Sequence, residues 1–176
     1  MLRFKSLSSG SSGNCTVVES MGIAPMRVLV DCGLGLKHLS ARLGEAGLQP
    51  DDIHAVFITH EHGDHIGCAR SLSLRYRIPV WMSHGTHAAI GAPDFDGLLR
   101  TARDGKAIDL GGMQITPFTV PHDAREPLQL TCTDGSAKGC PRPSRSPKRS
   151  ASTRRAAATW STRRASASSA SAPDER

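Results

Sequence analysis

Three histidines and one aspartate lie within six residues, in the segment THEHGDH at residues 59–65. Residues two apart on an extended strand point to the same side, so His60 and His62 can face one site. The glycine that follows lets the backbone turn, which allows Asp64 and His65 to come back toward the same point. Imidazole nitrogens and a carboxylate that converge in this way suit a borderline-soft divalent ion, zinc first and iron or manganese after it. The spacing therefore predicts a metal centre rather than a polar surface loop.

The elements on either side of this motif are well placed to position it. An apolar strand is expected at residues 55–58, directly before the motif, and a helix is expected at residues 66–76, directly after it. Apolar periodicity and turn residues place the other strands at 2–7, 15–19, 27–30, 80–82, 108–110, 113–120 and 128–133, and the other helices at 36–46 and 86–90. Strands interleaved with helices, together with antiparallel hairpins, predict a mixed α/β layered domain.

The formal net charge of +6 divides unevenly along the chain. Residues 1–136 carry 12 Lys and Arg against 14 Asp and Glu, whereas residues 137–176 carry 10 against 2. The second segment has no Val, Ile, Leu, Met, Phe or Tyr, so it cannot bury enough apolar surface to offset its chain entropy. We therefore expect a folded domain over residues 1–136 and a disordered basic tail, rich in Arg, Ser, Ala and Pro, over residues 137–176.

Several classes of protein are excluded by composition. No stretch approaches 18 uninterrupted apolar residues, and the N-terminus lacks the apolar region of a signal peptide, so we expect a soluble cytoplasmic protein without a membrane partner. The five cysteines are scattered and have no CxxC spacing, which argues against a disulfide framework or a zinc ribbon. Cys68 is interpreted as a small buried hydrophobic residue behind the motif. The oligomeric state stays open.

Two other polar features have alternative interpretations. The serine- and glycine-rich loop at residues 8–14 could cradle a phosphate through its backbone amides, or it could be a turn whose small residues allow close packing near the site. His84 and His87 could line a substrate cleft, although surface or helix-capping roles are the simpler interpretation. His38 and His54 have no partner pattern and are interpreted as surface residues.

The motif resembles that of the metallo-β-lactamase-fold hydrolases, and further segments agree with it. Members carry an aspartate at the end of an early strand, matched by Asp31 in LVDCG, and a later metal-binding histidine, matched by His122 in TVPHDA. The segment SGSSGN at residues 9–14, together with the HDA at residues 122–124, is most similar to the WalJ/YycJ branch, which is associated with DNA exonuclease activity. The resemblance covers residues 1 to about 136.

This resemblance implies an αββα-layered fold and metal-dependent hydrolysis, with two zinc ions expected and manganese or iron as alternatives. It implies a first ion held by His60, His62 and His122 and a second held by Asp64 and His65. Asp31 would accept a hydrogen bond and fix the orientation of a ligand. The ions would activate a water molecule, and Asp64 would either orient or deprotonate it or serve as a ligand alone. A nucleic acid or another phosphodiester is the implied substrate, and a thioester or lactam is the alternative.

Two later parts of the family pattern have no match in this sequence. No histidine follows His122, and Asp134 is expected at the tip of a hairpin rather than as a bridging ligand. We therefore expect only the N-terminal half to two-thirds of the fold and an incomplete second metal site. The basic tail resembles a reading frame translated out of register, which resequencing of the locus would test. The alternative is a genuine tail that binds nucleic acid through its phosphates, in a protein without catalytic activity.

An incomplete domain of this kind predicts low stability. Edge strands without partners and a missing packing layer favour aggregation over cooperative folding. Thermal unfolding of the isolated chain, followed by circular dichroism and light scattering, should show a broad transition at low temperature that is accompanied by aggregation. A sharp, reversible, cooperative transition would contradict this expectation.

Overall fold

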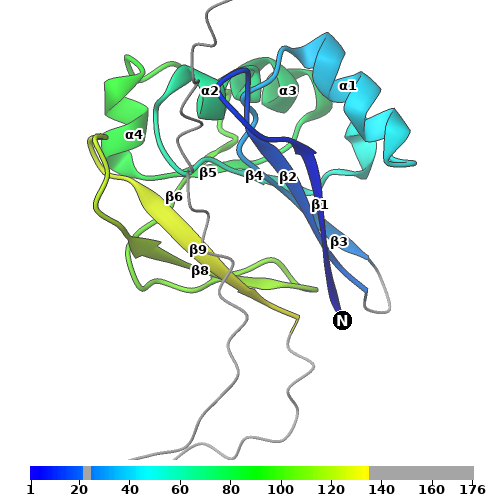
Figure 1. Cartoon of the computed structure of the whole chain (residues 1–176). Coiled ribbons are helices and arrows are strands. Elements are labelled where there is room, and N and C mark those ends of the chain that lie inside the picture. The colour runs from blue at the N-terminus through cyan, green and yellow to red at the C-terminus, as the bar shows by residue number, and fades with distance from the viewer. Residues whose placement is uncertain (22–24, 135–176) are drawn as a thin grey trace, which may run out of the picture.

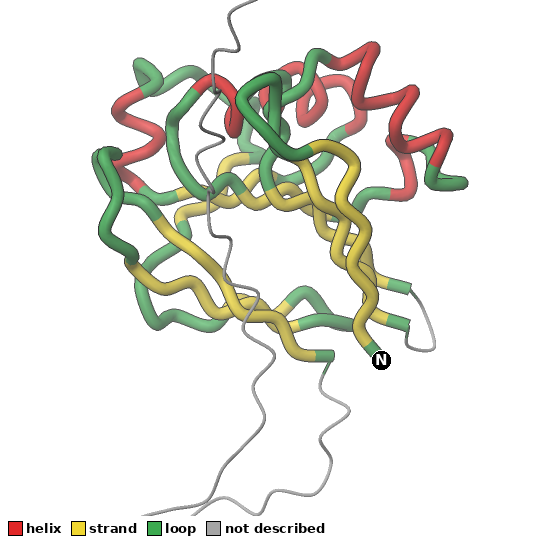
Figure 2. The backbone as a smooth tube through the Cα atoms, in the orientation of Figure 1, coloured by secondary structure: helices red, strands yellow, loops and turns green. Residues whose placement is uncertain are grey.

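The computed structural model describes residues 1–21 and 25–134, which form three layers (Figure 1). The helices cover one face of a six-stranded sheet, and a three-stranded sheet packs against its other face (Figure 2). The strands are β1 Leu2–Ser8, β2 Cys15–Ser20, β3 Met26–Val30, β4 Ala55–Phe57, β5 Val80–Met82, β6 Leu99–Thr101, β7 Ile108–Asp109, β8 Gln114–Thr119 and β9 Leu128–Thr133. The helices are α1 Leu36–Glu45, α2 Gly63–Ile66, α3 Ala69–Tyr76 and α4 His84–Ala89, with a 3-10 turn at Pro50–Asp52.

The strand order of the larger sheet brings the ends of two parallel strands together. The order is β1-β2-β3-β4-β5-β6, with antiparallel pairing from β1 to β3 and parallel pairing from β3 to β6. Val30, the last residue of β3, pairs with Phe57, the last residue of β4. Because parallel strands end at the same edge of a sheet, Asp31 and the THEHGDH segment emerge side by side. The predicted α/β fold class is confirmed.

Side chains of the central strands alternate between two apolar cores. Val56 of β4 and Leu29 of β3 pack toward the helices, where they meet residues such as Leu39 of α1. Ala55 and Phe57 of β4 point the other way, into the core between the two sheets. The period-two alternation of apolar residues thus buries both faces of the larger sheet, as expected for parallel strands covered on both sides.

Two elements differ from the sequence prediction. The helix expected at residues 66–76 begins only at Ala69, as α3, and a separate short helix, α2, ends at Ile66, because the chain turns sharply at Gly67, whose φ is +30°. A Cβ at Gly67 would lie 2.3 Å from the carbonyl oxygen of Cys32, so the break allows the segment to pack directly on the loop after β3. Strand β6 was not predicted, because its sequence Leu-Arg-Thr has no apolar run and its side chains are exposed or half-buried.

The second sheet is an antiparallel meander in the order β7-β8-β9. Within residues 1–21 and 25–134, no helix lies on its outer face, so three of the four layers of an αββα arrangement are described (Figure 1). The side chain of Asp134, just after β9, forms an ion pair with the amino terminus at Met1. None of the helices that the structure describes is long and apolar enough to cross a membrane. The basic tail predicted at 137–176 lies outside the described residues.

Candidate metal centre

Three histidine rings converge at the edge of the larger sheet where β3 and β4 end. His60 follows β4, His62 caps the start of α2, and His122 lies in the loop between β8 and β9. One nitrogen from each ring lies within 4.8 Å of the others. The Nε2 atoms of His60 and His122 are 3.1 Å apart, close to the roughly 3.3 Å between two ligand nitrogens of a tetrahedral zinc site. The donor set and its spacing therefore fit a divalent metal ion.

Hydrogen bonds through Thr59 fix the tautomer of His60. The Thr59 hydroxyl oxygen lies 2.9 and 3.0 Å from the two carboxylate oxygens of Asp31 and 2.8 Å from Nδ1 of His60. The hydroxyl has a single hydrogen, which it donates to the carboxylate, so Nδ1–H of His60 must donate to the hydroxyl. This leaves a lone pair on Nε2, the nitrogen that faces His122.

The electrostatic surroundings of His60 favour its neutral form. Burial, first, and then the neighbouring imidazoles of His65, His122 and His62 together lower the pKa of His60 to about 3, and the carboxylate of Asp64 opposes them only in part. A neutral imidazole is the form that binds a metal ion, so this ring does not need to lose a proton first.

A second cluster of polar side chains, formed by Asp31, Asp64 and His65, lies beside the three rings. Nδ1 of His65 is 2.7 Å from Oδ2 of Asp31, and Nε2 of His65 is 3.5 Å from Oδ2 of Asp64. Burial acts to lower the pKa of His65, but the hydrogen bond to Asp31 and the charges of both carboxylates raise it overall. The ring centroids of His60 and His65 are 4.0 Å apart, so the two groups form one continuous site. The structure thus brings together all six residues that the sequence singled out.

Glycines allow three loops to pack against one another beneath this site. A Cβ on Gly33 would lie 1.8 Å from the carbonyl oxygen of Asp64. The same close approach lets the backbone N–H of Cys32 donate to the carbonyl of His65 at 2.7 Å, and that of Asn14 donate to the carbonyl of Asp64 at 2.7 Å. The first turn of α2 is therefore held by backbone hydrogen bonds from the loop after β3 and from the loop between β1 and β2.

Three backbone N–H groups of the loop at residues 8–14 are used for hydrogen bonds within the protein and are not free to bind an anion. The N–H of Gly10 donates to the side-chain oxygen of Asn14, and the N–H of Gly13 donates to the carbonyl of Gly10, both at 3.0 Å. The N–H of Asn14 is bound to Asp64, as described above. These three donors are already committed within the protein, so the structure favours the interpretation of the loop as a packed turn.

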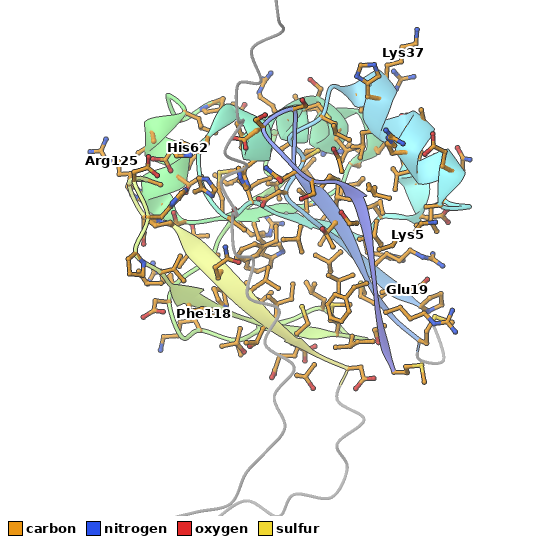
Figure 3. All side chains as sticks on the ribbon, viewed as in Figure 1. Lys5, Glu19, Lys37, His62, Phe118 and Arg125 are labelled. Carbon is orange, nitrogen blue, oxygen red and sulfur yellow. The ribbon has the colours of Figure 1, made fainter. Side chains whose placement is uncertain are left out.

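Glu61 is a residue of the site that the sequence analysis did not identify. It alternates with His60 and His62 along the extended chain, so its side chain points away from the side on which these two rings converge. Its Oε1 accepts a hydrogen bond from the backbone N–H of Arg125 at 2.6 Å. His62 and Arg125 accordingly lie at the same corner of the molecule (Figure 3). This contact ties the loop that carries His122 to the segment that carries the other two rings.

The remaining polar candidates lie away from the three rings. His38, His54 and His84 are exposed, as predicted. His87 is half-buried, and its Nε2 lies 3.0 Å from the carbonyl oxygen of Pro93. The prediction that Cys68 is a buried hydrophobic residue is confirmed: it belongs to the core under the helices, with its sulfur 3.5 Å from that of Cys32.

The family model of the metallo-beta-lactamase superfamily matches residues 9–138, which include all five candidate ligands. This chain belongs to the metallo-beta-lactamase superfamily. The prediction made from the HxHxDH motif, Asp31 and His122 is therefore confirmed for the family.

Individual superfamily members are similar over the same region. The chain is 32% identical over 130 residues to Exodeoxyribonuclease WalJ of Streptococcus pneumoniae and 33% identical over 132 residues to Exodeoxyribonuclease YycJ of Bacillus anthracis. These matches cover 71% and 72% of this chain but 47% and 48% of the relatives, so the chain spans about half their length. The predicted resemblance to the WalJ/YycJ branch is confirmed.

The fold is also shared with a solved structure, a metallo-beta-lactamase from Cronobacter sakazakii. The TM-score is 0.58 at 19% identity, and the match covers 72% of this chain and 56% of the other. This match supports the layered architecture of the superfamily.

Replacing Gly33 with alanine should disrupt the site that characterises the superfamily. The added Cβ meets backbone atoms of Asp64, which cannot move without displacing α2, so we expect the free energy of unfolding to fall by more than about 2 kcal/mol. Gly44→Ala is the matched control: Gly44 lies within α1 with open space around it, and alanine should stabilise the chain by about 0.5–1 kcal/mol. Urea unfolding measures both values, and equal effects of the two substitutions would refute the close-packing account.

Removing the Glu61 carboxylate should weaken metal binding at the three histidines. Glu61→Ala frees the loop that carries His122, so we expect the affinity for the first zinc ion to fall about tenfold. Glu61→Gln keeps an oxygen that can accept the Arg125 N–H and should retain most of the affinity. Isothermal titration with zinc distinguishes them, and an Ala variant that binds zinc as tightly as the parent chain would show that Glu61 does not position His122.

Proposed function

We propose that this chain holds a divalent ion on His60, His62 and His122 and hydrolyses phosphodiester bonds in nucleic acid. The observation that carries the proposal is the convergence of three imidazole nitrogens within 4.8 Å, with the neutral tautomer of His60 set by Thr59. Zinc is the proposed ion, because three protein ligands and an open position are typical of catalytic zinc. When bound, the ion would lower the pKa of a water molecule and polarise the phosphoryl group.

The cavity around the three rings has room for part of a nucleotide. Its volume is about 750 Å³, within the range of small-molecule sites. One wall is the turn that includes Ser9 and Ser11, and the opposite wall comes from the second sheet, with Phe118 and Gln129. A phosphodiester that enters between these walls would reach the metal-facing nitrogens directly. The naming of two relatives as exodeoxyribonucleases supports DNA as the polymer.

Asp64 is proposed to act on the attacking water. Its side chain is 32% exposed, whereas that of its neighbour His65 is 15% exposed, so it is the more accessible of the two polar groups beside the rings. A carboxylate in this position can accept a proton or a hydrogen bond from the nucleophile. Asp31 is 6% exposed, and its carboxylate is hydrogen-bonded to Thr59 and His65, so it is proposed to hold these groups in place and not to contact substrate.

Single substitutions in the full chain test this function. His62→Ala and Asp64→Ala should each lower the rate of degradation of end-labelled DNA by at least about 100-fold. His62→Ala should also lower zinc content measured by mass spectrometry after dialysis. His38→Ala, an exposed histidine outside the site, is the matched control and should change neither quantity.

A non-catalytic nucleic-acid-binding protein would behave differently in the same experiments. Its DNA affinity would depend steeply on salt, would be lost on deletion of residues 137–176, and would not need a metal ion. Unchanged zinc content in His62→Ala, or DNA degradation that survives Asp64→Ala, would overturn the hydrolase proposal.

A further inference from the structure

The side-chain amide of Asn14 contacts both Asp64 and His65, the two polar side chains next to the three histidine rings. Its Nδ2 is 2.9 Å from Oδ2 of Asp64 and 3.2 Å from Nε2 of His65. These are the same two atoms that a cation between Asp64 and His65 would contact. Asn14 is 9% exposed and is therefore largely buried beside the pair.

The amide is oriented with its NH₂ toward this pair. Its oxygen accepts a hydrogen bond from the N–H of Gly10 at 3.0 Å, and a flipped amide would place two donors against each other there. On the other side, Nδ1 of His65 lies 2.7 Å from the Asp31 carboxylate, to which it must donate. In the neutral ring, which is the form that would bind a metal ion, Nε2 is then an acceptor, so the Asn14 amide can donate one hydrogen to His65 and the other to Asp64.

Asp64 and His65 alone, as two protein ligands, make a weak cation site. The two amide hydrogens of Asn14 also point into the space between them. Among residues 1–21 and 25–134, the group of three or more His, Cys, Asp or Glu side chains that could hold an ion consists of His60, His62 and His122. Within the part of the chain that the structure describes, Asp64 and His65 therefore belong to no group of three such ligands. The hydrogens of Asn14 carry partial positive charge, which repels a cation from the same position.

We propose that the Asn14 amide takes the place of a second cation between Asp64 and His65, so that this chain holds one divalent ion tightly and admits a second only when the amide is removed. The amide satisfies the carboxylate and the imidazole without bringing a net charge. The inference rests on the proposed function only in treating Asp64 and His65 as potential metal ligands. Asn14 is thus a positioning residue that acts through these two side chains.

The decisive variant is Asn14→Asp, tested on the full chain. Aspartate has nearly the same shape but replaces the donating NH₂ with an acceptor oxygen, which turns a repulsive group into a third ligand. Isothermal titration with zinc chloride, together with metal content after dialysis, should show one tight ion in the parent chain. In Asn14→Asp, the affinity for a further ion should be at least about tenfold higher than in the parent chain.

Two further variants make the result specific. Ser12→Asp adds the same charge to the same loop at an exposed position and should leave zinc stoichiometry unchanged. Asn14→Ala removes the two donors without adding a ligand and should raise the affinity for a further ion by less than Asn14→Asp does. Asn14→Ala also tests the role of the amide if Asn14→Asp fails to fold, and far-UV circular dichroism would reveal such a failure.

The outcomes separate this inference from the proposed function. Two equally tight ions in the parent chain, no gain of affinity in either Asn14 variant, or an equal gain in Ser12→Asp would overturn the role of Asn14. A parent chain that binds no ion, alongside an Asn14→Asp variant that binds one, would support the role of Asn14 while the proposed function fails.

Discussion

The buried carboxylate of Asp31 is the interaction on which the site depends. It is 6% exposed and accepts hydrogen bonds from the N–H of Thr59 at 2.8 Å, from the Thr59 hydroxyl, and from Nδ1 of His65 at 2.7 Å. A carboxylate out of water is costly unless its oxygens are paired, and these donors supply that pairing. The same contacts join the end of β3 to the end of β4 and to α2. The backbone φ of Asp31 is +59°, an uncommon conformation for a residue with a side chain. That conformation directs the carboxylate to this position.

The strand pairing and hydrogen bonds around this carboxylate determine where the other residues of the site lie. Parallel pairing of β3 with β4 places Asp31 beside Thr59, and Thr59 in turn orients His60 through its hydroxyl. The carbonyl of Thr59 also accepts the N–H of Leu128 at 2.9 Å, which anchors the start of β9 to the larger sheet. The loop between β8 and β9, with His122, is held between that anchor and the contact of Glu61 with Arg125. A loop of the second sheet therefore contributes His122 to the three-histidine cluster at the edge of the larger sheet.

Much of this site could be predicted from the sequence, because its central residues are close neighbours in the chain. The spacing of His60, His62, Asp64 and His65 after an apolar strand indicates convergence through the period of an extended chain and one turn. His122 is a different case: it is 62 residues from His60 and was identified by its resemblance to a family pattern. The apolar strands and α1 were predicted by periodicity, whereas the break at Gly67 depends on a contact with Cys32 that no local pattern carries. The roles of Asn14 and Glu61 likewise arise from contacts across 50 and 64 residues of chain.

The central claim is that one divalent ion is held by three imidazoles in this chain. X-ray absorption spectroscopy of the full chain, loaded with one equivalent of zinc, tests it most directly. The account predicts a first shell of nitrogen and oxygen at about 2.0–2.1 Å, with the multiple-scattering pattern of about three imidazoles, and a loss of one imidazole in His122→Ala. A sulfur shell at about 2.3 Å, or a spectrum unchanged by His122→Ala, would contradict it.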